Sequence, residues 1–224
     1  KGSAVKKYLK LIERAGLKVI GLHSLFYDQK SLGLFTEGER RFKTLDFLVH
    51  LSSVCRDLGG RTMIYGGGRW KGGMPANLAR KLTIDFVSEL IPRIEGHGTT
   101  LCFEPLGERD SDFINSVSDS INLVKYFNHP SFRVQIDAKG LVENGELSAE
   151  IFNRAKPFLV HVHTNEPDLG ELGVSGAVNN HELARLLKSI GYNRYVSLEQ
   201  RMVRKKFDAE SIRRSIKIMK QYYL

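Results

Sequence analysis

Four segments of the 224-residue sequence end in a side chain that can bind a metal ion or exchange a proton. The segments are 101–104, 134–137, 160–163 and 196–199, and their last residues are Glu104, Asp137, His163 and Glu199. In each segment the first and third residues are apolar. Because successive side chains of a strand point to opposite faces, the apolar face is predicted to lie under packed helices. The pattern therefore predicts four strands that carry three carboxylates and one imidazole at their carboxyl ends.

A single carboxylate at a strand end is often a helix cap or an ion-pair partner, but four such ends indicate a common site. A parallel barrel directs the carboxyl ends of its strands to one rim, where active sites are found. Three carboxylates gathered there would repel one another unless a cation neutralised them, since an unpaired buried charge is costly. Oxygen and nitrogen ligands without a thiolate suit Mn²⁺, Mg²⁺, Co²⁺ or Zn²⁺. The sequence thus predicts one divalent metal ion as cofactor.

The segments that position these residues alternate between helix-like and strand-like patterns along the whole chain. Helices are expected at residues 6–15, 39–57, 75–95, 117–127, 148–154, 181–190 and from 208 to the C-terminus, and strands at 17–22, 62–65, 100–104, 133–137, 158–163 and 195–199. Such alternation with short connections is typical of a mainly parallel sheet covered by helices. Six strands fit a doubly wound sheet, or a barrel of eight from which two strands are missing.

Composition narrows the class of protein. Apolar residues make up 42% of the chain and charged residues 26%, as in an ordinary globular domain. The net charge of +9 lies largely on predicted helices without interleaved aromatic residues, which favours a solvated surface over a nucleic-acid partner. No apolar run approaches the roughly 18 residues of a membrane span. The two cysteines, Cys55 and Cys102, lack metal-type spacing, which predicts a reduced, cytoplasmic protein.

Several segments resemble the xylose-isomerase-like barrel superfamily, which includes sugar phosphate isomerases and ketose 3-epimerases. The resemblance is carried, in the family's order, by residues 101–106, 112–115, 135–139, 160–163 and 191–199. It implies an α/β fold, a (β/α)8 TIM barrel with the first two strands missing from this chain. Residues 1–224 are then expected to form a single barrel domain that is incomplete at its N-terminus.

The resemblance also implies roles for individual residues. The residues implied as metal ligands are Glu104, Asp137, His163 and Glu199. Glu104 and Glu199 would in addition be the catalytic acid–base pair. The resemblance places Asp110 and His23 against the substrate and matches the Gly-rich turn at residues 66–69.

Position and charge add further candidates for substrate binding. Glu166 lies three residues after His163, and Arg69 could hold a phosphate or carboxylate, as could Lys71, Arg109 and Lys139. Two positions depart from the pattern of many epimerases, since Gly140 and Leu169 stand where a histidine and an arginine are common. These departures bear on the substrate rather than on the metal.

The predicted function is a metal-dependent sugar or sugar phosphate isomerase or epimerase. A proton next to a carbonyl would be removed and returned through a metal-stabilised enediolate. Return to the opposite face gives epimerisation, and return to the neighbouring carbon gives aldose–ketose isomerisation. The alternatives are a dehydratase of a keto-polyol on the same site, an endonuclease IV-like DNA repair nuclease, for which the chain has too few histidines, and a non-catalytic sugar-binding barrel. The expected partner is a small sugar, and the oligomeric state is left open.

Overall fold

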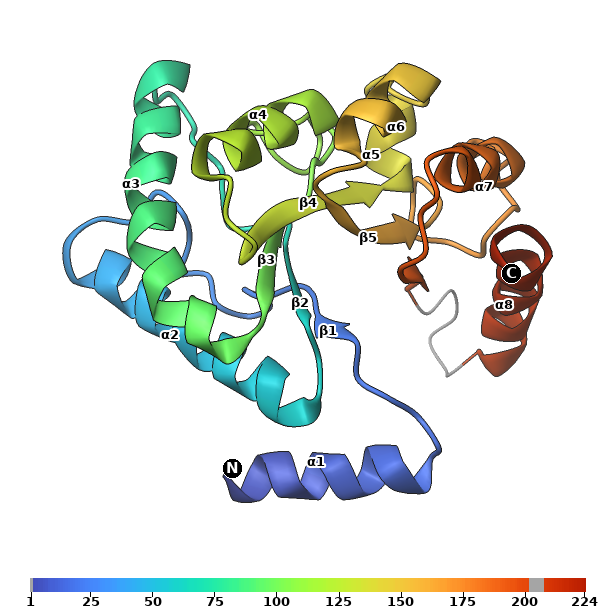
Figure 1. Cartoon of the computed structure of the whole chain (residues 1–224), viewed down its shortest axis with the longest axis horizontal. Coiled ribbons are helices and arrows are strands. Elements are labelled where there is room, and N and C mark those ends of the chain that lie inside the picture. Colours follow the sequence, from blue (N-terminus) through green and yellow to red (C-terminus); the bar gives the residue numbers. More distant parts are fainter. Residues whose placement is uncertain (1, 202–207) are drawn as a thin grey trace. The chain divides into compact units, whose positions relative to one another are not determined.

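The computed structural model describes residues 2–201 and 208–224 (Figure 1). The chain divides into two compact units. The first unit comprises Lys1–Phe103, Asp110–Phe113 and Leu123–Arg133, and the second unit comprises Glu104–Arg109, Ile114–Asn122 and Val134–Leu224. In the described part of the chain, no helix is both long and apolar enough to cross a membrane.

The first unit alternates helices with short parallel strands. Its elements are α1 (Ser3–Arg14), β1 (Gly21–Leu22), α2 (Gly38–Leu58), β2 (Thr62–Tyr65), α3 (Ala76–Ile94), the 3-10 turn η1 (Glu95–His97) and β3 (Thr100–Phe103). β1 pairs with β2 and β2 with β3, both in parallel. Gly16 and Gly59 follow α1 and α2 with φ of 66° and 92°, a backbone conformation that glycine adopts without strain.

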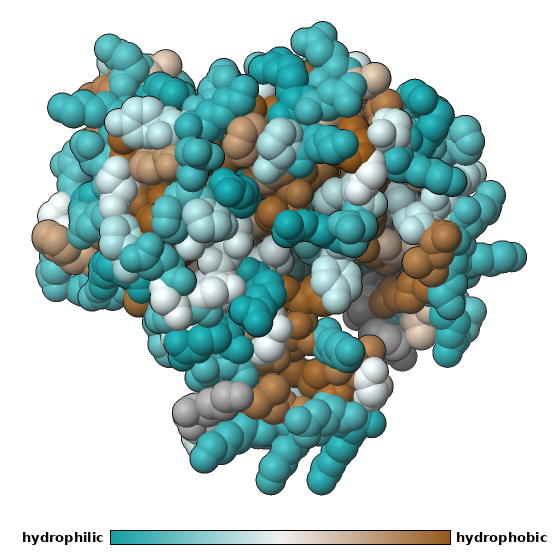
Figure 2. All heavy atoms as spheres, viewed as in Figure 1, coloured by the Kyte–Doolittle hydropathy of each residue, from teal (hydrophilic) through white to brown (hydrophobic). Residues whose placement is uncertain are grey.

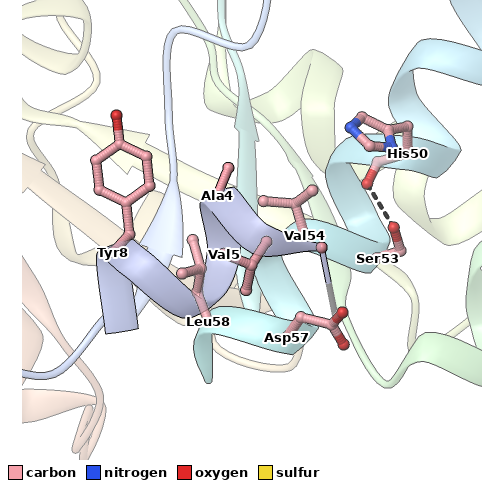
Figure 3. A pocket seen from close by; sticks show the side chains of 9 residues that line it. Ala4, Val5, Tyr8, His50, Ser53, Val54, Asp57 and Leu58 are labelled. Carbon is pink, nitrogen blue, oxygen red and sulfur yellow. Dashed lines mark hydrogen bonds between the residues drawn. The ribbon is translucent and has the colours of Figure 1, made fainter. Parts of the chain in front are cut away.

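The face of α1 that carries apolar residues lies beside α2. A groove of about 330 Å³ separates the two helices and is lined on the α1 side by Gly2, Ala4, Val5 and Tyr8, and on the α2 side by His50, Ser53, Val54, Asp57 and Leu58 (Figure 3). Figure 2 shows hydrophilic side chains extending outward from α1 and a band of apolar ones on its other side. With one carboxylate and one imidazole in its lining, this groove does not resemble a metal or acid–base site.

The second unit contains the remaining strands, again parallel and in chain order. The elements after β3 are α4 (Val117–Phe127), β4 (Phe132–Asp137), α5 (Ala138–Glu143), α6 (Ala149–Ala155), β5 (Leu159–Thr164), α7 (Asn180–Ser189), β6 (Val196–Leu198) and α8 (Ala209–Tyr223). Residues 123–133, which span the end of α4 and the start of β4, belong to the first unit. Asp137 of β4 is in register with His163 of β5, and His163 with Ser197 of β6.

Several element bounds differ from the expected ones. β1 and β6 have two and three residues instead of the six and five expected, and Glu104 and Glu199 lie one residue beyond the ends of their strands. Pro92, expected in a bend, lies within the last turn of α3. Asp208 was expected to cap the last helix, and this is confirmed, because its side chain accepts a hydrogen bond from the backbone N–H of Ser211.

Helix α5 was not expected at all. It has six residues, too few to show a helical repeat in the sequence, and it starts immediately after β4. Asp137 is its N-cap, and the Asp137 side chain accepts a hydrogen bond from the backbone N–H of Gly140. The residue predicted as a metal ligand therefore also begins a helix.

Candidate metal centre

Four acidic and imidazole side chains meet within the second unit. They are Glu104, Asp137, His163 and Glu199, named here the acidic cluster. Each offers a ligand atom, and these atoms all lie within 4.8 Å of one another. Glu104, Asp137 and His163 are buried and Glu199 is half-buried. Within residues 2–201 and 208–224, this cluster is a set of three or more His, Cys, Asp or Glu side chains that could together hold a metal ion.

The strand register brings these side chains together. Asp137 is the last residue of β4. It lies beside His163, which is one residue before the end of β5. The backbone N–H of Glu199 donates to the carbonyl of Thr164 at 3.0 Å, which continues the β5–β6 pairing one step beyond β6. Nδ1 of His163 lies 3.0 Å from Oε1 of Glu104 and 3.6 Å from Oε2 of Glu199. The imidazole is thus placed between the two glutamates.

Asn165 completes the arrangement, and sequence reasoning missed it. Its side-chain Nδ2 donates to Oδ2 of Asp137 at 2.5 Å and to Oε2 of Glu199 at 2.9 Å. Its Oδ1 accepts from the backbone N–H of Lys139 at 2.9 Å. The signal in the sequence was the alternation of side chains, since Asn165 follows His163 at the i+2 position. The strand expected over residues 158–163 stops short of Asn165, which is why the alternation does not point to it.

Burial and mutual repulsion shift the protonation of the acidic cluster. Burial, and then the charge of Glu104, raise the pKa of Asp137 from its ordinary 3.8 to about 8, although the Gly140 N–H opposes the shift. For His163, burial alone lowers the pKa. The hydrogen bond and charge of Glu104, with Glu199 and Asp137, outweigh that effect, so the pKa is raised overall. Positive charge on the imidazole is favoured because negative charge is in excess around it.

This donor set fits a divalent cation. Three carboxylates and one imidazole without a thiolate match the preferences of Mn²⁺, Mg²⁺, Co²⁺ or Zn²⁺. A cation would also relieve the repulsion that raises the pKa of Asp137. The excess of buried negative charge therefore agrees with the ligand chemistry.

Glu166 also belongs to the second unit, but its carboxylate contacts a loop. Its Oε1 accepts from the backbone N–H of Gly173 at 2.6 Å, and its Oε2 accepts from the hydroxyl of Ser175. The side chain is buried. In this structure Glu166 holds the connection that follows β5, and its contact with substrate stays a prediction.

The other three predicted substrate residues belong to the first unit, whereas the acidic cluster belongs to the second. His23 is exposed, and its Nδ1 lies 3.3 Å from the Ser24 hydroxyl. Asp110 is half-buried. Arg69 is buried, and its guanidinium donates to the carbonyls of Tyr65 and Phe113. Contact of His23, Asp110 and Arg69 with substrate stays a prediction.

The two departures from the epimerase pattern have local structural correlates. A Cβ at Gly140 would lie 2.8 Å from the carbonyl oxygen of Pro105, so the segment after Glu104 packs where a side chain would stand. Leu169 adopts φ of 52°, and its carbonyl accepts from the Arg201 N–H at 2.9 Å. A histidine at position 140 would require this packing to change.

A family comparison bears on the fold. The sequence pattern of the xylose isomerase-like TIM barrel family matches residues 1–222. The chain belongs to this family. The expected α/β fold class is thereby confirmed, with six parallel strands in the described part of the chain.

Individual relatives are sugar epimerases. D-psicose 3-epimerase from Ruminiclostridium cellulolyticum is 27% identical over 118 residues, which are 52% of this chain and 40% of that protein. The match thus spans less than half the length of this curated relative. The structure of 3-keto-D-glucoside 4-epimerase from E. coli superposes with a TM-score of 0.83 at 20% identity, covering 97% of this chain and 84% of that chain.

A second solved structure gives the same result. D-psicose 3-epimerase from Clostridium cellulolyticum H10, crystallised with D-tagatose, superposes with a TM-score of 0.78 at 16% identity. The superposition covers 100% of this chain and 94% of that chain. Because both identities are 20% or lower, these solved structures establish the shared fold and nothing further.

Proposed function

We propose that this protein is a metal-dependent sugar or sugar phosphate isomerase or epimerase whose single divalent cation is bound by the acidic cluster. The observation that carries the proposal is the convergence of three carboxylates and one imidazole within 4.8 Å in a largely buried site. Such a concentration of negative charge, with the pKa of Asp137 raised to about 8, is costly to the apo fold. A site with this cost is expected to have a function.

The relatives support the class of reaction. Both the curated relative and the solved structures described above are epimerases of sugars or sugar derivatives. A sugar with a carbonyl group and a neighbouring hydroxyl presents oxygen atoms to a hard cation. We therefore infer a carbonyl-containing sugar as substrate class.

All four residues of the acidic cluster are proposed to bind the cation, and two of them are proposed to carry protons as well. A cation bound there supplies Lewis acidity, which polarises a carbonyl oxygen and offsets negative charge that develops on it. Asp137 and His163 are buried on adjacent strands, and their role is to hold the cation. Glu104 and Glu199 come from segments 95 residues apart in the sequence, and we assign them proton removal and proton return. The Glu199 side chain is 22% exposed, which supports its assignment as a group that meets the substrate.

The test combines metal analysis with isotope exchange. The protein is purified without chelator, its metal content is measured, and ketoses are incubated with it in D₂O. We expect about one divalent ion per chain and exchange of the proton next to the carbonyl. Glu104→Gln and Glu199→Gln are expected to slow this exchange by roughly 10²-fold or more, the usual contribution of a general acid or base. Glu182→Gln, at an exposed ion pair with Arg185, is the matched control and is expected to leave the rate unchanged.

Three outcomes would overturn the proposal. About three zinc ions per chain with cleavage of abasic DNA would indicate a nuclease. Loss of water from a keto-polyol, without inversion of the carbon that exchanges its proton with D₂O, would indicate a dehydratase. Failure to bind Mn²⁺, Co²⁺ or Zn²⁺ at millimolar concentration would remove the metal site itself.

A further inference from the structure

We infer that Asn165 is a positioning residue that holds two of the cation's carboxylate ligands at a set separation, an inference that rests on the proposed metal site. The Asn165 amide lies between Asp137 at the end of β4 and Glu199 beyond the end of β6. It donates one hydrogen bond to each, at 2.5 Å and 2.9 Å. Asn165 is 1% exposed, so water does not compete readily for these contacts.

The orientation of the amide is determined by a third contact. The backbone N–H of Lys139 donates at 2.9 Å to the Asn165 side chain, so the accepting atom must be Oδ1. The opposite atom is then the NH₂ group, whose two hydrogens match the two carboxylates. The Asn165 side chain therefore uses its oxygen for α5 and both of its N–H groups for the acidic cluster.

A neutral donor is well suited to this position. Two carboxylates that share a buried site repel each other, and hydrogen bonds to their charged forms reduce the cost. A lysine or arginine there would also reduce the repulsion, but its positive charge would compete with the bound cation. Each carboxylate oxygen that Asn165 contacts retains a further lone pair, which leaves capacity for a metal ion. Asn165 can thus prepare the ligands without displacing the cation.

Asn180 provides a matched comparison within the same unit. It is also buried, at 5% exposure, and its Nδ2 donates to the carbonyl of Val178 at 3.4 Å. Its Oδ1 accepts from the hydroxyl groups of Thr164 and Tyr223, at 2.7 Å each. Asn180 thus links α8 to β5. It contacts neutral hydroxyl groups, whereas Asn165 contacts the carboxylates of two proposed ligands. Removing either amide deletes buried hydrogen bonds, but only the loss of Asn165 should act on the metal.

The test compares Asn165→Leu with Asn180→Leu, which replace each amide by an apolar side chain of similar size. Mn²⁺ affinity is measured by titration calorimetry on protein stripped with chelator, below the unfolding temperature of both variants. We expect Asn165→Leu to weaken Mn²⁺ binding by about 10- to 100-fold, the usual cost of losing a partner of a metal ligand. Asn180→Leu is expected to lower the unfolding temperature but to change Mn²⁺ affinity by less than about threefold.

A second pair of variants covers the case in which Asn165→Leu does not fold. Asn165→Asp and Asn180→Asp keep the side-chain shape and each add one negative charge. We expect the metal-free Asn165→Asp protein to unfold at a lower temperature than metal-free Asn180→Asp, and saturating Mn²⁺ to restore much of that difference. Equal unfolding temperatures without metal would contradict the inference.

The outcomes separate this inference from the proposed function. If the unaltered protein does not bind Mn²⁺, the metal site itself is wrong. If the unaltered protein binds Mn²⁺ and Asn165→Leu binds it equally well, the metal site stands and the positioning role is wrong. If both leucine variants weaken Mn²⁺ binding to the same extent, Asn165 is a structural residue without a specific effect on the ligands.

Discussion

Each of the two units buries charge, but in different ways. In the first unit Arg69 is 1% exposed, and its Nε and Nη1 donate to the hydroxyl of Ser111 and the carbonyls of Phe113 and Tyr65 at 3.0–3.3 Å. Its guanidinium carbon lies 5.5 Å from the centre of the Phe103 ring. In the second unit the acidic cluster gathers three carboxylates around one imidazole.

The difference lies in how each charge is compensated. A guanidinium is delocalised, weakly hydrated and rich in donors, so neutral acceptors and a ring face can replace much of its hydration. A cluster of carboxylates needs donors or positive charge, and the contacts described for it come mainly from Gly140, Asn165 and His163. Buried charge alone therefore does not mark a functional site. A gathering of buried carboxylates that repel one another is the more informative feature.

The comparison can first be tested where the largest effect is expected, at Asp137. Asp137→Asn retains an oxygen that can cap α5 but removes one negative charge and one ligand. We expect Mn²⁺ affinity to fall by more than about 100-fold, a larger loss than is expected when a residue that only hydrogen-bonds to a ligand is removed. Titration calorimetry measures the loss, with Asp119→Asn on the exposed side of α4 as control. Retained affinity would mean that Asp137 is only a helix cap.

The second test asks whether Arg69 is structural. Arg69→Met keeps much of the volume and removes the guanidinium donors, leaving the buried carbonyls of Tyr65 and Phe113 without these partners. We expect the free energy of unfolding to fall by about 2–3 kcal/mol, as measured by urea denaturation, with Mn²⁺ affinity unchanged. Unchanged stability together with a raised KM for a phosphorylated sugar would instead support the predicted contact between Arg69 and substrate.

The third test concerns the pH dependence of stability, where the effect per pH unit is smaller than the two effects above. Because the pKa of Asp137 is about 8 in the folded protein and 3.8 ordinarily, the folded state retains a proton that the unfolded chain has released between these pH values. The free energy of unfolding of the metal-free protein should therefore fall as pH rises, by about 1 kcal/mol per pH unit near neutrality. The raised pKa of His163 acts in the same direction.

Urea denaturation of metal-free protein at pH 5, 6, 7 and 8 measures this slope. Asp137→Asn is expected to reduce it, and saturating Mn²⁺ to reduce or reverse it, because bound ligands are deprotonated in the folded state. A metal-free protein whose stability rises over this range would show that the carboxylates of the acidic cluster are better compensated than their contacts indicate.

Much of the local structure could be predicted from the sequence. β2 and α4 have the expected bounds, and the other expected helices and strands are present with ends shifted by a few residues. β1 and β6 are shorter than expected and contain two and three residues. A strand ends where its hydrogen-bonding partner ends, and that is a property of the neighbouring segment, which a local pattern does not contain.

The residues of the acidic cluster could be chosen from the sequence alone, because alternation along a strand and the order of the strands are local properties. What the tertiary structure decided is how each charge is compensated. The partners of Arg69 at positions 111 and 113 lie more than 40 residues away, and Asn165 joins Asp137 to Glu199 across 28 and 34 residues. Such contacts depend on chain packing, since a side chain's partners are set by which strands lie adjacent. The sequence therefore determined which groups could do chemistry, and the packing decided which buried charges are compensated by neutral partners and which gather in a cluster that could hold a cation.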